Sequence, residues 1–155
     1  MVNWTIRPDD LSGREIRALL EQHFAGMLAN SPKDSCHFLD FDGLKAGNVS
    51  FWSIWRDDRL AGCGALKQHD GDLGEVKSMR VADGFRGWGA GHAMLEHVIA
   101  EARGRGLSQL ALETGSGAAF ADAERLYRRA GFISCPPFAD YRPDPFSQFM
   151  MMQLG

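Results

Sequence analysis

Residues 77–91, KSMRVADGFRGWGAG, decide the fold of this 155-residue chain. A strand-like segment leads through a short turn into a glycine-rich loop, and a helical segment follows. Gly87, Gly89 and Gly91 remove side chains, so backbone N–H groups of the loop can turn inward and converge. Such a nest at a helix N-terminus, with Arg86 at its rim, is typical of a phosphate site. Glycine spacing alone also permits a plainer interpretation, a flexible turn at a helix entry.

Two better-known phosphate loops do not fit this stretch. The dinucleotide pattern G-x-G-x-x-G requires a third glycine where this chain has His92, or Met94 in the alternative register. The P-loop requires a Gly-Lys pair, and the sequence contains none. The loop is therefore neither a dinucleotide-binding turn nor a P-loop.

Hydrophobic periodicity on either side of the loop predicts alternating strands and helices. Ser12 and Glu15 have capping-box spacing, and an apolar stripe of helical period follows them to Leu28. The order is βα(α)βββαβαββ, which indicates an α/β or α+β domain with helices on both faces of a sheet. Strands are predicted at 2–8, 51–56, 60–67, 75–81, 109–113, 132–135 and 149–154, and helices at 12–28, within 31–45, at 89–103 and at 119–130.

Composition is that of an ordinary globular protein, with 45% hydrophobic and 24% charged residues. We find no repeat or linker and expect one domain over 1–155. The N-terminus lacks the apolar stretch of a signal peptide, and three widely spaced cysteines suit a reducing compartment, so we expect a cytoplasmic protein. The formal charge of −3 argues against a nucleic-acid partner. No apolar run approaches the roughly 20 residues of a membrane span, so we expect no membrane partner.

Two motifs resemble the landmarks of the GNAT superfamily of N-acetyltransferases. Residues 86–91, RGWGAG, follow a strand and resemble the family signature Arg/Gln-x-x-Gly-x-Gly/Ala. Residues 123–132, AERLYRRAGF, resemble the second landmark, Ala-x-x-Leu-Tyr-x-x-x-Gly-Phe. The combination SMR…LETG…DYRPDP further resembles a branch of small bacterial acetyltransferases.

This resemblance implies a mixed, mostly antiparallel sheet that splays in the middle, with helices on both faces. It also implies direct attack of a primary amine, on a small molecule or a peptide, on the thioester of acetyl-CoA. In the family, backbone groups at the splayed strand pair with the pantetheine of the cofactor. The residues that the resemblance assigns to acetyl-CoA are Met79, Arg80, Val81, Arg86, Gly87, Trp88, Gly89, Ala90, Gly91, Phe120 and Tyr127. Phe120 is a departure, because many members have asparagine there.

Three residues are candidates for catalysis. Tyr127 is the expected general acid for the departing thiolate, although its helical spacing also fits a packed core tyrosine. Glu75 is the expected base for the amine, and Glu113 is its competitor at the end of the next strand. Either carboxylate could instead solvate a strand end or pair with a neighbouring cation.

The acceptor side is predicted from an early strand and a proline-rich loop. Trp52 lies on the strand, and Asp140, Tyr141 and Arg142 lie in the loop. Asp140 could attract a cationic amine and Arg142 could hold a carboxylate, so the charge of the acceptor stays open. Ordinary packing and loop solvation are the alternative for all four residues.

A second class of function stays open beside catalysis. A GNAT-like module could bind acyl-CoA and act as a sensor or interaction domain. The five histidines and three cysteines form no His-x-x-x-His or Cys-x-x-Cys pair, so no metal is expected. A homodimer is left open.

Overall fold

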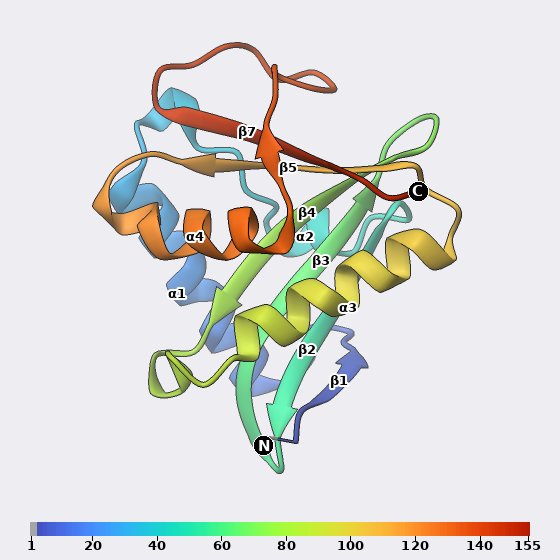
Figure 1. Cartoon of the computed structure of the whole chain (residues 1–155). Helices are drawn as coiled ribbons and strands as arrows, with labels where there is room; N and C mark the ends of the chain where they lie inside the picture. The colour runs from blue at the N-terminus through green and yellow to red at the C-terminus, as the bar shows by residue number, and fades with distance from the viewer. Residues whose placement is uncertain (1–2) are drawn as a thin grey trace.

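The computed structural model describes residues 3–155, and its centre is a seven-stranded sheet (Figure 1). The strand order is β1-β2-β3-β4-β5-β7-β6, and every neighbouring pair is antiparallel except β4 with β5. The strands are β1 (Thr5–Pro8), β2 (Val49–Arg56), β3 (Arg59–Gln68), β4 (Leu73–Val81), β5 (Gln109–Gly115), β6 (Ile133–Ser134) and β7 (Ser147–Gln153). The helices are α1 (Arg14–Asn30), α2 (Phe41–Leu44), α3 (Ala90–Gly104) and α4 (Ala121–Ala130), with 3-10 turns at Lys33–Ser35, Asp83–Phe85 and Ala118–Phe120.

Helices cover both faces of the sheet, which confirms the predicted mixed α/β architecture (Figure 1). α3 and α4 pack on one face, and α3 buries an apolar stripe of helical period that includes Met94, Leu95, Val98 and Ala102. α1 and α2 pack on the opposite face, against a separate apolar cluster of β2 and β3. The sheet therefore separates two large apolar clusters, and a third, small cluster of Ala111, Phe138 and Phe149 lies under the proline-rich loop.

The start of α1 differs from the sequence-based prediction. Ser12 was expected to cap the helix, but its hydroxyl donates a hydrogen bond to Asp10 Oδ1 at 2.6 Å. The helix begins at Arg14 after the N-cap residue Gly13, with no side-chain cap. The local Asp10–Ser12 bond therefore satisfies the hydroxyl that a capping box would have used.

Other boundaries move by a few residues. The helix expected at 119–130 begins at Ala121, after a 3-10 turn, and the region 31–45 holds only a 3-10 turn and the short α2. The first strand begins at Thr5; Val2 of its predicted range lies outside the described residues. No helix between residues 3 and 155 is long and apolar enough to span a bilayer.

Gly62 on β3 marks the tightest contact between two strands of the sheet. It pairs with Val81, and a Cβ atom at this position would lie 2.5 Å from the backbone oxygen of Arg80. Backbone cannot move aside as a flexible side chain can, so β3 and β4 would have to separate.

We therefore expect Gly62→Ala to lower the free energy of unfolding by about 1–3 kcal/mol, the usual cost of overpacking. Urea denaturation followed by circular dichroism measures this difference. Gly47→Ala is the matched control, because no heavy atom lies within 4 Å of its added Cβ. Equal stability of the two variants would show that the β3–β4 contact is not tight.

Candidate active site

The sheet opens between its two parallel strands, β4 and β5. They pair only at their first residues, from Leu73 opposite Gln109 to Glu75 opposite Ala111. Beyond Glu75 the two strands diverge, and β4 continues to Val81 without a β5 partner (Figure 1). Backbone groups of β4 on this side are thus left for something other than the sheet.

A bulge at Ser78 accompanies the opening. Cys63 pairs with Arg80 and Ala65 pairs with Lys77, so β4 carries one residue more than β3 between these pairs. Ser78 has a φ of 56° and its carbonyl accepts a hydrogen bond from Cys63 Sγ at 3.2 Å. The extra residue changes the alternation of the strand.

Because the bulge shifts the alternation of β4, the side chains after Ser78 point to different faces of the sheet than they would in a regular strand. Met79 and Val81 turn toward α3, where Met79 Sδ lies close to Gly64 and Val81 Cγ2 close to Gly91. Arg80 turns toward α1, the same face as Lys77, and its Nη1 lies near Gly26. Without the bulge, Arg80 would point into the α3 core.

A cavity of about 190 Å³ lies where the strands part. The cavity is lined by residues of α1 on one face of the sheet and of α4 on the other, with the diverging ends of β4 and β5 between them. Its lining consists of His23, Gly26, Met27, Asn30, His37, Phe38, Val76, Lys77, Ser78, Met79, Arg80, Glu113, Thr114, Ala119, Phe120, Ala123 and Tyr127.

The structure brings several predicted site residues together here. Met79, Arg80, Glu113, Phe120 and Tyr127 all line this cavity, which we call the split-strand cavity. A larger cavity of about 520 Å³ lies beside β1 and the start of α1, and none of the predicted site residues lines it.

Glu113 holds its carboxylate at the β5 wall of the split-strand cavity. Its Oε2 lies 2.6 Å from Nδ1 of His37 and accepts a hydrogen bond from Ser147 Oγ at 2.8 Å. Its side chain is only 7% exposed, so the His37–Glu113 pair sits in a partly desolvated position. A carboxylate–imidazole pair of this kind can accept a proton from a bound group.

Glu75 is placed differently. It is 1% exposed, does not line the split-strand cavity, and is surrounded by hydrogen-bond partners. The Tyr141 hydroxyl donates to it at 2.6 Å, His69 Nε2 lies at 2.8 Å and Lys77 Nζ at 3.3 Å. Burial, and then the Glu75 carboxylate, raise the pKa of Tyr141 well above its usual value. The network ties the proline-rich loop to β4.

The predicted acceptor residues therefore separate into two places. A neighbouring cavity of about 440 Å³ is lined by Asp140, Tyr141 and Arg142, together with Glu75 and His37. Tyr141 also belongs to the Glu75 network, whereas Asp140 and Arg142 are exposed. Trp52 is 4% exposed and packs edge-to-face on His97 of α3, in the core on the other side of the sheet. Trp52 is thus a packing residue in this structure and lines none of the three cavities.

Tyr127 reaches the split-strand cavity from α4. Its ring packs edge-to-face on Phe132 with 6.0 Å between the centroids, so the packing role foreseen for it is present. Burial raises the pKa of Tyr127 to about 12, which keeps the phenol protonated at neutral pH. The hydroxyl is therefore available as a proton donor and not as a base.

The glycine-rich loop follows β4 and enters α3. Gly87 and Gly89 have φ values of 81° and 94°, which L side chains rarely adopt, and a Cβ on either would meet no heavy atom within 4 Å. Gly89 is the N-cap of α3 and no side chain caps the helix, so its first N–H groups face open space. This arrangement fits a phosphate group.

Gly91 and the neighbouring side chains of the loop have other roles. A Cβ at Gly91 would lie 3.3 Å from Val81 and 3.4 Å from Leu126, so this glycine lets α3 approach β4 and α4. Trp88 is 47% exposed, and the Arg56 guanidinium lies 4.7 Å from its ring centroid. Arg86 Nη2 lies 3.4 Å from Asp83 Oδ1 in an exposed pair.

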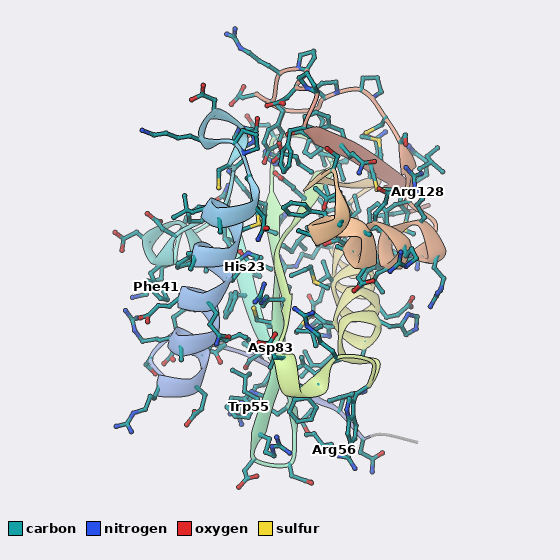
Figure 2. All side chains as sticks on the ribbon, turned by 90° about the vertical axis from the view of Figure 1, so that its left-hand side faces the viewer. His23, Phe41, Trp55, Arg56, Asp83 and Arg128 are labelled. Carbon is teal, nitrogen blue, oxygen red and sulfur yellow. The ribbon has the colours of Figure 1, made fainter. Side chains whose placement is uncertain are left out.

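Sequence reasoning missed part of the split-strand cavity. His23, His37, Lys77 and Ser78 line it, and none of them was a predicted site residue. His23 lies between α1 and the sheet (Figure 2) and is 8% exposed, although α1 was described only by its apolar residues. A histidine within that apolar stripe was the available signal. Among residues 3–155, no three His, Cys, Asp or Glu side chains are grouped to hold a metal ion.

The sequence of the chain matches a known family, and its fold matches solved structures. The acetyltransferase (GNAT) family profile matches residues 14–132. The uncharacterized N-acetyltransferase YsnE of Bacillus subtilis (strain 168) is 46% identical over 149 residues, which cover 96% of this chain and 99% of that protein.

Solved structures agree with the profile. A Klebsiella pneumoniae protein assigned as an acyl-CoA N-acyltransferase superposes with a TM-score of 0.78 at 29% identity, covering 98% of both chains. A GNAT family acetyltransferase of Elizabethkingia anophelis, solved with acetyl-CoA bound, has a TM-score of 0.72 at 20% identity and covers 99% of this chain and 100% of its own; at this identity it supports the fold.

Gly89 offers a test of the phosphate role of the loop. Gly89→Glu adds a negative charge in the open space before α3, so acetyl-CoA affinity should fall by more than a factor of ten, which is about 1.4 kcal/mol. Isothermal titration calorimetry measures this affinity.

Gly89→Ala is the matched control, because it imposes the same backbone strain at a φ of 94° without the charge. Its affinity should lie between those of the wild type and Gly89→Glu. Equal affinity of the two variants would assign the loss to strain and remove the electrostatic argument.

Proposed function

The chain belongs to the acetyltransferase (GNAT) family and is an acetyl-CoA-dependent acyltransferase, and we propose that it transfers the acetyl group to a primary amine of a small molecule in the split-strand cavity. One observation carries this proposal: the unpaired part of β4, the His37–Glu113 pair and the Tyr127 side chain converge on a single cavity. These are the groups that an aminolysis of a thioester needs.

The cofactor would lie along the open edge of β4. The loop at residues 86–91 would hold its pyrophosphate, and the backbone of Met79 and Val81 would pair with its pantetheine. Phe120 lines the cavity where many relatives of this fold place an asparagine, so an apolar contact would replace a hydrogen bond there. Acetyl-CoA supplies the activated thioester.

Glu113 would remove a proton from the ammonium form of the acceptor, directly or through His37, and so leave the amine neutral. The amine nitrogen then bonds to the thioester carbon, and a backbone N–H of unpaired β4 would donate to the oxyanion. When the carbon–sulfur bond breaks, Tyr127 would give its proton to the departing thiolate. Solvent would take up the second proton that the nitrogen loses as the amide forms, return a proton to Tyr127 and remove one from Glu113, so the site is restored.

We prefer Glu113 to Glu75 as the base for a geometric reason. Glu113 lines the cavity, whereas Glu75 is enclosed by Tyr141, His69 and Lys77. Glu75 would instead position the proline-rich loop over β4. The same reasoning leaves Asp140 and Arg142 as outer contacts of the acceptor entrance.

We also propose that residues 1–155 form one acetyltransferase domain that acts in the cytoplasm. Cys36, Cys63 and Cys135 are free thiols in the described structure, as a reducing compartment would maintain them.

The Tyr127 assignment is tested by Tyr127→Phe, which keeps the ring and removes only the hydroxyl. If the hydroxyl protonates the thiolate, kcat should fall about 10²-fold or more while acetyl-CoA affinity changes little. Thiol release from acetyl-CoA, assayed over a panel of amines, measures kcat. Full activity in this variant would leave Tyr127 with packing alone, and stability should change by only about 1 kcal/mol in either case.

The choice of base is tested by comparing Glu113→Gln with Glu75→Gln. Glu113→Gln should lower kcat/KM at neutral pH, and the loss should shrink at higher pH, where free amine is abundant. Glu75→Gln should lower thermal stability, because it disturbs a buried network, and any loss of activity should not depend on pH in this way. The reverse pattern would return the role of base to Glu75.

A further inference from the structure

Arg80 has no anionic partner in the described structure. Among residues 3–155 its guanidinium makes no ion pair or hydrogen bond, and its Nε atom is fully buried without a partner. It lines the split-strand cavity on the α1 side, with Nη1 near the backbone of Gly26. A guanidinium with five donors in this position is incompletely satisfied.

The surroundings of Arg80 do not neutralise it. His23 lies beside it, and burial, then the charges of Arg80 and Lys77, lower the pKa of His23 to about 4. His23 is therefore neutral at pH 7 and adds no negative charge. Lys77 lies 3.3 Å from Glu75, and Glu113 is engaged by His37 and Ser147.

Holding an unpaired cation in a partly buried site costs free energy, because hydration is lost and no counter-ion replaces it. Ser78 adds a second orphan, since its hydroxyl is buried in the same lining without a hydrogen-bond partner. These two unsatisfied polar groups lie two residues apart at one bulge and indicate a ligand with acceptor oxygens.

The phosphates of acetyl-CoA do not fit as that ligand. The bulge at Ser78 sends Arg80 to the α1 face, whereas Val81 and the loop that follows it pack toward α3. A cofactor held by residues 86–91 would therefore present its phosphates on the other side of β4. The anion must belong to the acceptor.

We propose that the acceptor is a small amine that carries a carboxylate, of the amino-acid type, with the carboxylate bound by Arg80 and the amine presented to Glu113. A guanidinium matches a carboxylate in a two-point geometry, and the Ser78 hydroxyl would donate a third hydrogen bond. The cavity of about 190 Å³ is smaller than the roughly 300–1,000 Å³ of sites for drug-sized ligands, which favours a free amino acid over a folded protein. This inference rests on the proposed acetyl transfer to an amine.

The family resemblance assigned Arg80 to acetyl-CoA and left Arg142 to hold a carboxylate; the proposal instead gives the carboxylate to Arg80. Arg142 is exposed at the neighbouring cavity, so water screens its charge. Arg80 is partly buried, and an ion pair formed there on binding would be screened much less.

The test compares matched pairs of acceptors. Each of the standard amino acids is assayed for thiol release beside its amide, which keeps the amine and side chain and loses the charge. For the best amino acid, wild-type kcat/KM should exceed that of the amide by at least ten-fold. In Arg80→Gln this preference should fall to near one, because KM for the amino acid rises by a larger factor than KM for the amide.

Arg14→Gln is the matched control, because it removes the same charge from the exposed N-terminal end of α1. It should keep the wild-type preference. Arg80→Lys should retain part of it, since it keeps the charge but loses the two-point geometry. Amides used as well as amino acids by the wild type, or an equal loss on both by Arg80→Gln, would overturn the proposal.

Two further measurements keep this test apart from that of acetyl transfer. Arg80→Gln should unfold at the same or a higher temperature than the wild type, because it removes an uncompensated charge; marked destabilisation would mean that Arg80 is structural. Calorimetry with N-acetyl amino acids and their amides reports carboxylate binding without turnover. If no amine is acetylated but N-acetyl amino acids bind through Arg80, the proposal of acetyl transfer fails and the anion site stands. If N-acetyl amino acids bind no more tightly than their amides, the anion site fails.

Discussion

The site depends on one extra residue in β4, at Ser78. Because β4 carries three steps where β3 carries two, the pairing of Lys77 with Ala65 and of Arg80 with Cys63 is possible only with a bulge. The bulge increases local twist and interrupts the β3–β4 ladder, which resumes at Arg80, and β4 parts from β5 after Glu75. Every group assigned to chemistry lies along the opening that results.

In the proposed arrangement the same bulge would separate the two substrates. Met79 and Val81 face α3 and the glycine-rich loop, so the cofactor side of β4 is apolar and ends at a helix N-terminus. Lys77 and Arg80 face α1, where Lys77 is paired with Glu75 and Arg80 has no counter-ion, so the proposed acceptor side holds one uncompensated positive charge. A thioester inserted from one face and an amine from the other would meet at the unpaired backbone of β4, between Glu113 on β5 and Tyr127 on α4.

Charge in this region is arranged at a cost to stability. Glu75 is buried and compensated by Lys77, His69 and Tyr141, whereas Arg80 and Ser78 are left with unsatisfied atoms. The compensated Glu75 network ties the proline-rich loop to β4, whereas the uncompensated groups are the ones we propose to bind the acceptor. Among residues 3–155, Ser31 Oγ and His97 Nε2 are also buried without a partner, but only Ser78 and Arg80 of these four residues line the split-strand cavity.

The sequence by itself determined the family, the alternation of strands and helices and the glycine-rich loop, because these depend on local patterns: period-2 and period-3.6 apolar spacing, and glycines where φ is positive at Gly87 and Gly89. It placed Tyr127, Met79 and Phe120 through motifs whose spacing is local. Only the tertiary structure decided which carboxylate reaches the cavity, that Trp52 belongs to a core, and that Arg80 lacks a counter-ion. Those outcomes depend on how α1, β4, β5 and the proline-rich loop meet, and residues distant in the chain, such as His23, His37 and Glu113, become neighbours only when the sheet forms.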